Sequence, residues 1–452
     1  MSLPHLEKAR EWAAVIGDDW QKFAGVALQI REETVHMDEK LVPAYTLPSA
    51  LDLPGNTRIR NAGEWSNKRR QEVLELFKNE MYGQIPPRPD HLEFEVLSCK
   101  EGALNGLALR KEVRITCSMN NGQKHAFDLL VYLPLGAQKP VPVFAGLNFK
   151  GNHACTVEED VTMTPVRFND GRFATAEEAL AFYGKEKMLT VRNPAFYAPE
   201  QRGCQAGRWC FEELVKRGYG AVTACYEDIF PDGANGWEFS ALSLFEDLTG
   251  HVGYHPRYTA IGAWAWGLSR IMDYLESCPE VDASRVAVHG HSRLGKTALW
   301  TGATDPRFKL VISNDSGCGG AAVSRRAYGE NWLVICNYFP HWFVTASRKY
   351  MGNEDQMPFD QHWLISLMAP RPVAVASATE DQWADPRGEF LSALNAREVY
   401  ALFGSQGLPE NEMPPAGKFL TGDVSYHLRE GKHDQTPEDW AHYLEIADIY
   451  LK

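Results

Sequence analysis

The sequence lacks three features that would point to whole classes of protein. It has no apolar run near the roughly 18 residues that a membrane-spanning helix needs. Its nine cysteines form no Cys-x-x-Cys pair, which argues against a zinc ribbon or a thioredoxin-type redox site. It has no excess of positive charge, because 46 Lys and Arg stand against 59 Asp and Glu, a net charge of −13. We therefore expect neither a membrane nor a nucleic acid as partner, since phosphate binding needs clustered positive charge.

Targeting and linker segments are also missing. Residues 1–20 have no basic start followed by an apolar stretch, so we expect no signal peptide in this chain. Hydrophobic residues make up 44% of the 452 and charged residues 23%, which is ordinary for a globular protein and excludes a disordered chain. We expect a single domain over 1–452, with residues 1–90 as an N-terminal arm packed on it, and a monomer.

Strand-like and helix-like segments alternate along the rest of the chain. The spacing of apolar residues predicts helices over Asn67–Tyr82 and Tyr258–Glu276, and Thr436-Pro437 begins a final helix that runs to Tyr450. Strands are predicted at Leu92–Leu97, Phe127–Leu133, Val141–Leu147, Ala221–Tyr226, Val286–His289, Leu310–Ser313 and Val373–Ser377. The last four contain almost no charge, as strands buried on both faces do. This alternation predicts an α/β fold with a mostly parallel sheet between helices.

The segment from Val286 to Thr297 fits two catalytic motifs. Gly290-His-Ser292-Arg-Leu-Gly295 resembles the turn that presents a nucleophilic serine, although the usual G-x-S-x-G has one residue fewer before its second glycine. The same stretch, ending in Lys296-Thr297, also satisfies the phosphate-loop pattern G-x-x-x-x-G-K-[ST]. Both motifs require a strand before the turn and a helix after it, so the segment alone leaves a serine hydrolase and a nucleotide-binding protein open.

Two later segments favour the hydrolase. A serine hydrolase of this kind needs an acid and then a histidine further along the chain, so that the imidazole can take the serine proton. Asp381 follows the predicted strand Val373–Ser377, and His433 lies in a polar loop just before the final helix. A phosphate loop accounts for neither position. A nucleotide-binding protein remains the alternative, and magnesium-dependent ATP binding through Lys296 would identify it.

Several longer motifs resemble the glucuronoyl esterases of carbohydrate esterase family 15. They occur in the family's order and cover nearly the whole chain: Trp65 with Arg69 and Arg70, GLNFKGNH (146–153), GHSRLGKTALW (290–300), SNDSGCGGAAVSRR (313–326), NYFPHWF (337–343), DQHWLISLMAPRPV (360–373) and DQWADPRGEF (381–390). The resemblance is to the bacterial branch, because His291 stands where fungal members carry a disulfide-forming cysteine.

The resemblance implies an α/β-hydrolase fold with a three-layer sandwich. It also implies a serine-type carboxylic ester hydrolase that cleaves glucuronate esters linking xylan to lignin alcohols, without metal or cofactor. The expected substrate is a glucuronoxylan or lignin–carbohydrate ester, and the expected location is periplasmic or secreted. A carbohydrate deacetylase similar to the acetyl xylan esterases, on the same fold, is the alternative activity.

The family's site residues carry over to eight positions. Ser292 resembles the nucleophile, His433 the general base and Arg293 the residue that helps to stabilise the oxyanion. Lys296, Glu330 and Trp383 match positions that contact the sugar. Two acids are candidates for orienting His433. Asp315 stands in Asp-Ser-Gly where many members carry the longer Glu, and Asp381 matches an acid found in bacterial members. We slightly prefer Asp381, because the shorter Asp315 side chain reaches less far.

Overall fold

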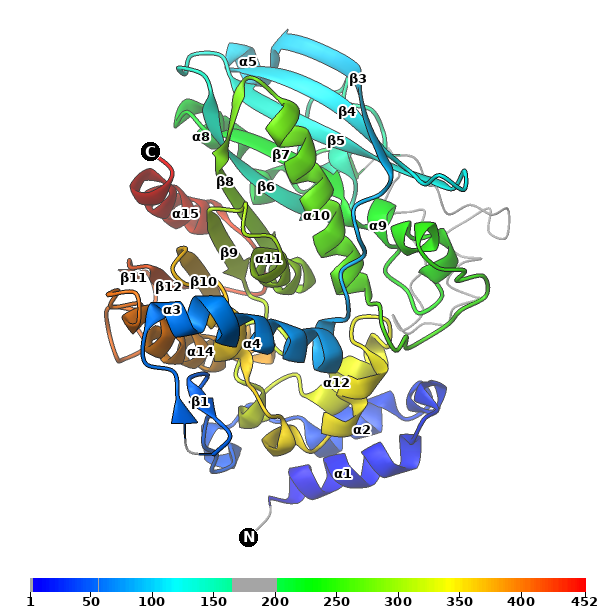
Figure 1. Ribbon diagram of the computed structural model, residues 1–452, viewed down its shortest axis with the longest axis vertical. Coiled ribbons are helices and arrows are strands. Elements are labelled where there is room, and N and C mark those ends of the chain that lie inside the picture. Colours follow the sequence, from blue (N-terminus) through cyan, green and yellow to red (C-terminus); the bar gives the residue numbers. More distant parts are fainter. Residues whose placement is uncertain (1–2, 56, 165–200) are drawn as a thin grey trace.

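The computed structural model describes residues 3–55, 57–164 and 201–452, and its centre is a twisted sheet of ten strands in the order β11-β12-β10-β9-β8-β6-β7-β5-β4-β3 (Figure 1). The six strands from β12 to β7 are parallel to one another, whereas β11 and the three strands β5, β4 and β3 are antiparallel to their neighbours. The predicted mostly parallel α/β sheet is confirmed.

The strands of the described residues are β1 (Asp52–Leu53), β2 (Thr57–Arg58), β3 (His91–Gly102), β4 (Ala108–Ser118), β5 (Lys124–Pro134), β6 (Val141–Asn148), β7 (Gly220–Cys225), β8 (Val281–His291), β9 (Leu310–Asn314), β10 (Val373–Ala378), β11 (Phe419–Leu420) and β12 (Val424–Arg429). The α-helices are α1 (Pro4–Ile16), α2 (Ala27–Thr34), α3 (Ala62–Glu64), α4 (Arg70–Phe77), α5 (Ala103–Gly106), α7 (Ala206–Trp209), α8 (Phe211–Lys216), α9 (Tyr226–Ile229), α10 (Ala260–Ser277), α11 (Arg293–Thr304), α12 (Trp332–Tyr338), α13 (Gln361–Ser366), α14 (Pro386–Ala401) and α15 (Pro437–Tyr450).

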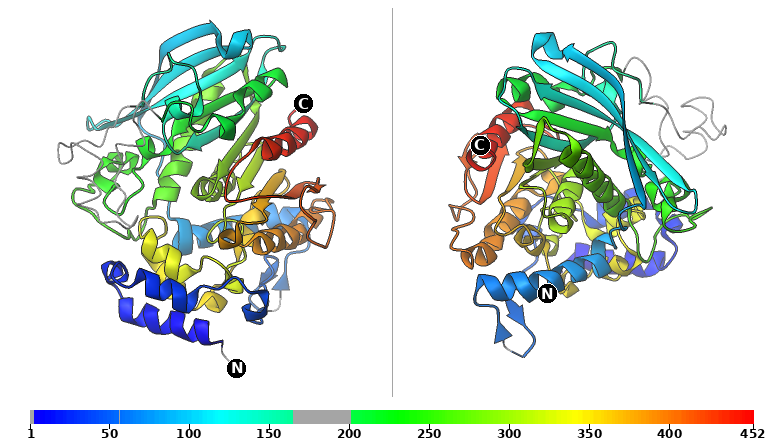
Figure 2. Two further views of the ribbon diagram at one scale, coloured as in Figure 1. Left: turned by 180° about the vertical axis from the view of Figure 1, so that it is seen from behind. Right: turned by 45° about the horizontal axis from the view of Figure 1, so that its top comes forward.

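Alternate residues of the central strands face two different layers of helices. Val286 and Val288 of β8 belong to an apolar cluster shared with α10, α11, α13 and α14. Ala287, between them, belongs to a second cluster shared with α8 and α15. Side chains along a strand point alternately to opposite faces, so both faces of β8 must be apolar. Figure 2 shows the same sheet from behind, with α15 now in front of it.

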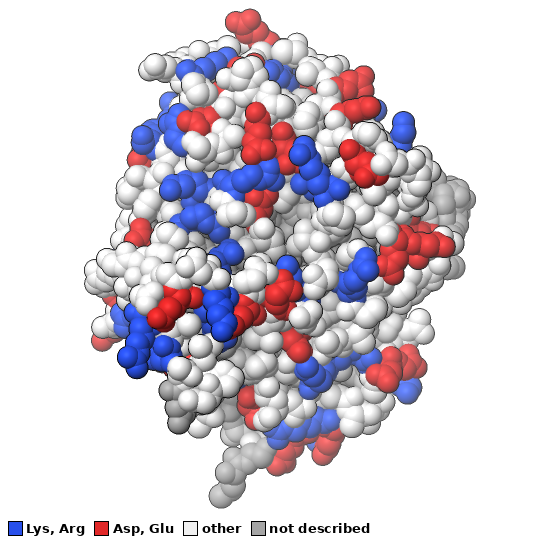
Figure 3. Space-filling view, in the orientation of Figure 1, with Lys and Arg blue, Asp and Glu red and all other residues white. Residues whose placement is uncertain are grey.

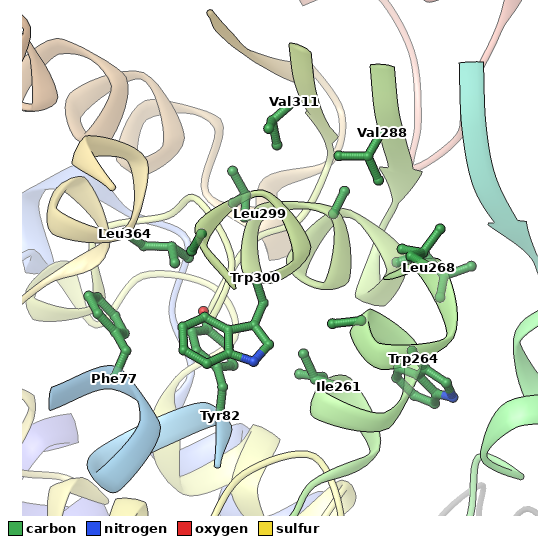
Figure 4. Packing of buried hydrophobic residues seen from close by; sticks show 14 of the residues in the cluster. Phe77, Tyr82, Ile261, Trp264, Leu268, Val288, Leu299, Trp300, Val311 and Leu364 are labelled. Carbon is green, nitrogen blue, oxygen red and sulfur yellow. The ribbon is translucent and has the colours of Figure 1, made fainter. Parts of the chain in front are cut away.

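The larger cluster joins the sheet to the N-terminal arm. Trp300 on α11 packs against Tyr82, with ring centroids 4.8 Å apart, and Phe77 of α4 lies beside them (Figure 4). The helical segment that carries Phe77 and Tyr82 begins at Ala62 in α3, continues through a π-helical turn at Trp65–Arg69 and ends at Gly83. Gly83 has a φ of 78°, and a Cβ there would lie 2.6 Å from the carbonyl oxygen of Arg257. The predicted helix over Asn67–Tyr82 is thus present, and only glycine fits its end.

Some elements were not predicted. The arm contains the helices α1 and α2 as well as extended segments, and β4, β11 and β12 had no predicted counterpart. The chain from 165 to 200 lies outside the described residues. Within the described part, no helix combines the length and the apolar character needed to cross a membrane. On the face drawn in Figure 3, acidic and basic side chains are interspersed over the surface.

Candidate active site

Ser292 lies on a sharp turn between β8 and α11. Its φ of 60° and ψ of −128° are strained for a residue with a side chain, and its backbone N–H donates to the Asn314 carbonyl oxygen of neighbouring β9 (2.8 Å). A Cβ at Gly290 would lie 2.0 Å from the Leu294 carbonyl oxygen. A Cβ at Gly295 would lie 3.0 Å from the carbonyl oxygen of Asn314. The tight turn therefore requires glycine at 290, and it leaves little room for a side chain at 295, the position displaced by a residue from the usual pattern.

His433 joins the serine to an acid. Its Nε2 lies 2.9 Å from Ser292 Oγ, and its Nδ1 lies 2.6 Å from Asp381 Oδ2. Ser292, Asp381 and His433 come from loops that follow β8, β10 and β12, three parallel strands whose carboxyl ends meet at one edge of the sheet. Asp381 is buried, whereas the side chain of His433 is 43% exposed. A hydroxyl, an imidazole and a buried carboxylate in this order can deprotonate the serine and hold the resulting imidazolium.

The loops that carry Asp381 and His433 are hydrogen-bonded to each other beyond the ends of their strands. The Thr379 N–H donates to the Arg429 carbonyl oxygen (3.0 Å), and the Glu380 N–H donates to the Gly431 carbonyl oxygen (2.8 Å). The Gly431 N–H in turn donates to Thr379 Oγ1 (3.2 Å). These bonds fix the acid loop and the base loop relative to one another.

Asp315, the second candidate acid, lies beside the first. One nitrogen or oxygen atom from each of Asp315, Asp381 and His433 lies within 4.8 Å of the others. Asp315 Oδ2, however, accepts from Arg429 Nη2 (3.2 Å) and from the Asp434 N–H (3.3 Å), and no direct bond joins it to the imidazole. Burial raises the pKa of Asp315 well above its ordinary value, and nearby carboxylates add to this effect. The structure thus brings both acids to His433 but hydrogen-bonds only Asp381 to it.

The same three side chains form the one set among the described residues with enough nearby donors to hold a metal ion. Two of the donor atoms, His433 Nδ1 and Asp381 Oδ2, are only 2.6 Å apart and share a hydrogen bond. A metal ion with bond lengths of about 2 Å to each would have to replace that bond and its proton. The arrangement fits a triad better than a metal centre.

Arg293, the residue after the serine, is held in place by a buried carboxylate. Asp232 accepts from Arg293 Nη1, from His341 Nε2 (2.8 Å) and from the Trp342 indole N–H (2.8 Å). Burial alone would raise the pKa of Asp232, but the Arg293 charge and the bond from His341 lower it below its ordinary value. The guanidinium also lies over the rings of Trp342 and Phe339. Arg293 is thereby a fixed positive charge next to Ser292.

Lys296, one helical turn beyond Ser292 on α11, lies near the oppositely charged side chain of Glu330. Lys296 is buried and its Nζ donates to the Ser316 carbonyl oxygen (2.6 Å). Burial lowers the pKa of Lys296, and the nearby Glu330 carboxylate opposes that shift. Burial raises the pKa of Glu330, while Lys296 and a hydrogen bond from the Trp383 side chain lower it. Lys296, Glu330 and Trp383 therefore form one polar group, as the resemblance implies for a sugar contact.

The N-terminal arm supports this polar group, which the sequence did not reveal. The Gly329 N–H donates to the His36 carbonyl oxygen (2.9 Å), and the Tyr328 hydroxyl donates to the Met37 carbonyl oxygen (3.1 Å). The guanidinium of Arg31 on α2 lies 4.7 Å from the ring centroid of Trp383. The arm thus contacts both the loop that carries Glu330 and the Trp383 ring.

Known proteins similar to this chain were found by sequence and by structure. The carbohydrate esterase MZ0003 of an unknown prokaryotic organism is 44% identical over 422 residues, which cover 92% of this chain and 91% of that protein. A promiscuous CE15 esterase from a marine bacterial metagenome is 43% identical in its solved structure, with a TM-score of 0.79, and covers 92% of this chain and 100% of that one. The chain belongs to carbohydrate esterase family 15.

Further matches agree with this membership. A sequence model of fungal glucuronyl esterases matches residues 253–404 of this family 15 esterase. A glucuronoyl esterase from Solibacter usitatus is 42% identical with a TM-score of 0.80, over 92% of this chain and 100% of that one. The 4-O-methyl-glucuronoyl methylesterase 1 of Wolfiporia cocos is 35% identical over 36% of this chain and 41% of its own length. This family 15 esterase is a carboxylic ester hydrolase with the α/β-hydrolase fold.

Family membership also resolves the two motifs in the segment 290–297. In this family 15 esterase, Lys296 is buried against the Ser316 carbonyl, and the Thr297 hydroxyl donates to the Arg293 carbonyl oxygen (3.0 Å). The phosphate-loop interpretation was wrong, because the chain belongs to a family of carboxylic ester hydrolases and the Thr297 hydroxyl, which would bind the magnesium ion, is bound to the protein's own backbone.

Proposed function

We propose that this enzyme cleaves esters between the carboxyl group of (4-O-methyl-)glucuronic acid on xylan and lignin alcohols. The observation that carries the proposal is the bridge formed by His433, with one ring nitrogen on Ser292 and the other on Asp381. Because this substrate is a plant cell-wall polymer, we also propose that the enzyme works outside the cytoplasm. We propose that residues 1–452 act as one catalytic unit, with the arm 1–90 part of it.

The reaction begins with proton transfer from Ser292 Oγ to His433 Nε2, 2.9 Å away, as the serine attacks the ester carbonyl. Asp381 holds the Nδ1–H of the same ring and stabilises the imidazolium that forms. The imidazolium then protonates the leaving alcohol, and an acyl-enzyme remains. Water, deprotonated by the same imidazole, releases the uronic acid and restores the serine.

Arg293 stabilises the tetrahedral oxyanion. Asp232 fixes one side of the guanidinium, and this positive charge stands on the residue that directly follows Ser292. A donor held in place before the reaction costs no reorganisation when the negative charge develops, and loss of one such donor typically costs on the order of 3 kcal/mol. The charge of Arg293 is therefore available where the ester oxygen becomes negative.

Lys296, Glu330 and Trp383 bind the acyl side of the substrate. A Lys–Glu pair presents both donors and acceptors to neighbouring sugar hydroxyls, and an indole packs against the ring. Since these groups recognise the uronic acid and not the alcohol, the enzyme tolerates different alcohols as leaving groups.

A nucleophile variant tests the proposal directly. We expect Ser292→Ala to lower kcat on the benzyl ester of glucuronic acid by at least about 10⁴-fold, because no other group replaces the attacking oxygen. Hydrolysis is followed by release of benzyl alcohol, and circular dichroism checks that the variant is folded. Turnover near the wild-type rate in a folded Ser292→Ala protein would rule out Ser292 as the nucleophile.

Carbohydrate deacetylation is the second candidate function. The marine relative is described as promiscuous, and a serine triad by itself accepts many esters. Comparison of acetylated xylan with glucuronate esters separates the two activities. We expect higher kcat/KM for the glucuronate ester, because an acetyl group leaves Lys296 and Glu330 without a ligand.

A further inference from the structure

The side chain of Arg429 connects the catalytic loop to the interior of the protein. Arg429 is the last residue of β12, is 1% exposed, and comes four positions before His433. Its Nε donates to Asp439 Oδ2 (2.9 Å), and its Nη2 donates to Asp315 Oδ2 (3.2 Å). One guanidinium thus lies between two buried carboxylates, which hold it in a fixed orientation.

The same guanidinium also binds the backbone on both sides of His433. Nη2 lies 2.7 Å from the Lys432 carbonyl oxygen and 2.5 Å from that of Asp434, and Nη1 lies 3.1 Å from the Glu430 carbonyl oxygen. The two N–H groups of Nη2, shared among these two carbonyls and Asp315, therefore hold the residues immediately before and after His433. We infer that Arg429 is a positioning residue that fixes His433 between Ser292 and Asp381.

In the second half of the loop, Asp434 has two other anchors, an ion pair with Arg208 (2.6 Å) and a bond from its N–H to Asp315 Oδ2 (3.3 Å), but Arg429 also binds the backbone before His433. Lys432 and His433 are exposed, and Gly431 has a φ of 109°. The bonds to Thr379 and Glu380 secure the loop only as far as Gly431. Catalysis requires the imidazole within hydrogen-bond reach of both partners, and a displacement of about 1 Å can cost roughly 100-fold in rate.

Lysine cannot replace this arginine. The planar guanidinium offers five N–H donors in a rigid fork, whereas an ammonium group has three donors on a flexible stem. Arg429→Lys keeps the positive charge between Asp315 and Asp439 but cannot bind both carboxylates and the carbonyls around His433 together. The substitution therefore separates the positioning of the loop from simple charge neutralisation.

The inference rests on the proposed function. Testing Arg429→Lys both in the wild-type enzyme and in a His433→Ala variant separates failure of the inference from failure of the proposed function. We expect Arg429→Lys to lower kcat on glucuronate benzyl ester at least tenfold with KM changed less than about twofold. In a His433→Ala background, the same substitution should reduce the residual rate by less than about twofold, because the group that it positions is already gone. Equal fold losses in both backgrounds, or an unchanged kcat in Arg429→Lys, would overturn the inference and leave the Ser292 result standing.

A matched control separates positioning from general stability. Arg110 on β4 is also buried and is paired with the carboxylates of Glu158 and Asp160. We expect Arg110→Lys to lower the melting temperature without the selective loss of kcat. If Arg429→Lys is not recovered folded, the double variant Arg429→Gln/Asp439→Asn, which removes the guanidinium together with one of its two carboxylates, carries the same two-background test.

Discussion

The two acids beside His433 should differ sharply in their effect on catalysis. Asp381→Asn removes the negative charge that is bonded to His433 Nδ1 at 2.6 Å. A unit charge pair at about 4 Å between charge centres is worth about 4 kcal/mol at an effective dielectric constant of about 20. This stabilisation exists only when the imidazole is protonated, as it is in the transition state. We therefore expect kcat to fall by roughly 10³-fold.

Asp315→Asn should cost far less, although a carboxylate oxygen of Asp315 also lies within 4.8 Å of a ring nitrogen of His433. If Asp315 were ionised and unpaired, a charge pair about 5 Å apart would contribute about 3 kcal/mol by the same arithmetic. Two observations reduce this contribution. Arg429 lies 3.2 Å from Asp315 Oδ2 and opposes its charge, and burial raises the pKa of Asp315 well above its ordinary value, which favours the neutral form. We expect a loss of tenfold or less in kcat.

Initial rates on glucuronate benzyl ester measure both variants, with thermal unfolding as the check on folding. The asparagine oxygen can still accept from Arg429, so Asp315→Asn should fold. A folded Asp315→Asn enzyme that is slower than Asp381→Asn would show that the hydrogen bond to Nδ1 does not identify the functional acid. Asp315, and not Asp381, would then be the acid that supports His433 in catalysis.

Two other substitutions test binding and stability. Lys296→Met keeps the volume of the buried side chain but removes the charge that faces Glu330. We therefore expect KM for the glucuronate ester to rise about tenfold, while hydrolysis of p-nitrophenyl acetate is unchanged. Equal losses on both esters would contradict a role of Lys296 in sugar binding. The second substitution concerns Glu354, whose pKa is raised by burial from 4.5 to about 7. Between these two pH values the folded protein holds a proton that the unfolded chain releases. The free energy of unfolding therefore falls as the pH rises from 4.5 to about 7. Glu354→Gln should remove about 2 kcal/mol of the difference in unfolding free energy between pH 5 and pH 8, measured by urea denaturation, and an unchanged difference would show that Glu354 does not titrate there.

The sequence predicts the parts of this fold that short apolar runs encode. β7, β9 and β10 are mostly apolar and contain no charged residue, and their burial on both faces follows from that composition. β4 carries Arg and Glu among its apolar residues, and β12 carries Ser, His and Arg, so neither has the composition of a buried strand. Their polar side chains are satisfied by partners outside the strand, Glu158 and Asp160 for Arg110 of β4 and Asp439 for Arg429 of β12, and no local pattern reveals those contacts.

The active site likewise combines residues that local sequence reveals with residues that it does not. Ser292, Asp381 and His433 could be named because each follows a recognisable strand or precedes a recognisable helix. The residues that hold them could not. Asp232 anchors Arg293 from a separate loop, and Glu389 accepts from the Ser316 and Gly317 N–H groups from within α14. A charged residue at the end of a buried strand, as Arg429 is, would be the signal to look for.

The contacts of the N-terminal arm bear on protein engineering. His36 and Met37 hold the 328–330 loop through their backbone carbonyls, and Arg31 covers the Trp383 ring. Exchanging the 328–330 loop alone between related enzymes would remove these contacts, since the supporting residues lie nearly three hundred positions upstream. Chimeras meant to alter sugar preference should therefore transfer residues 27–37 together with the loop, and expression vectors should retain both.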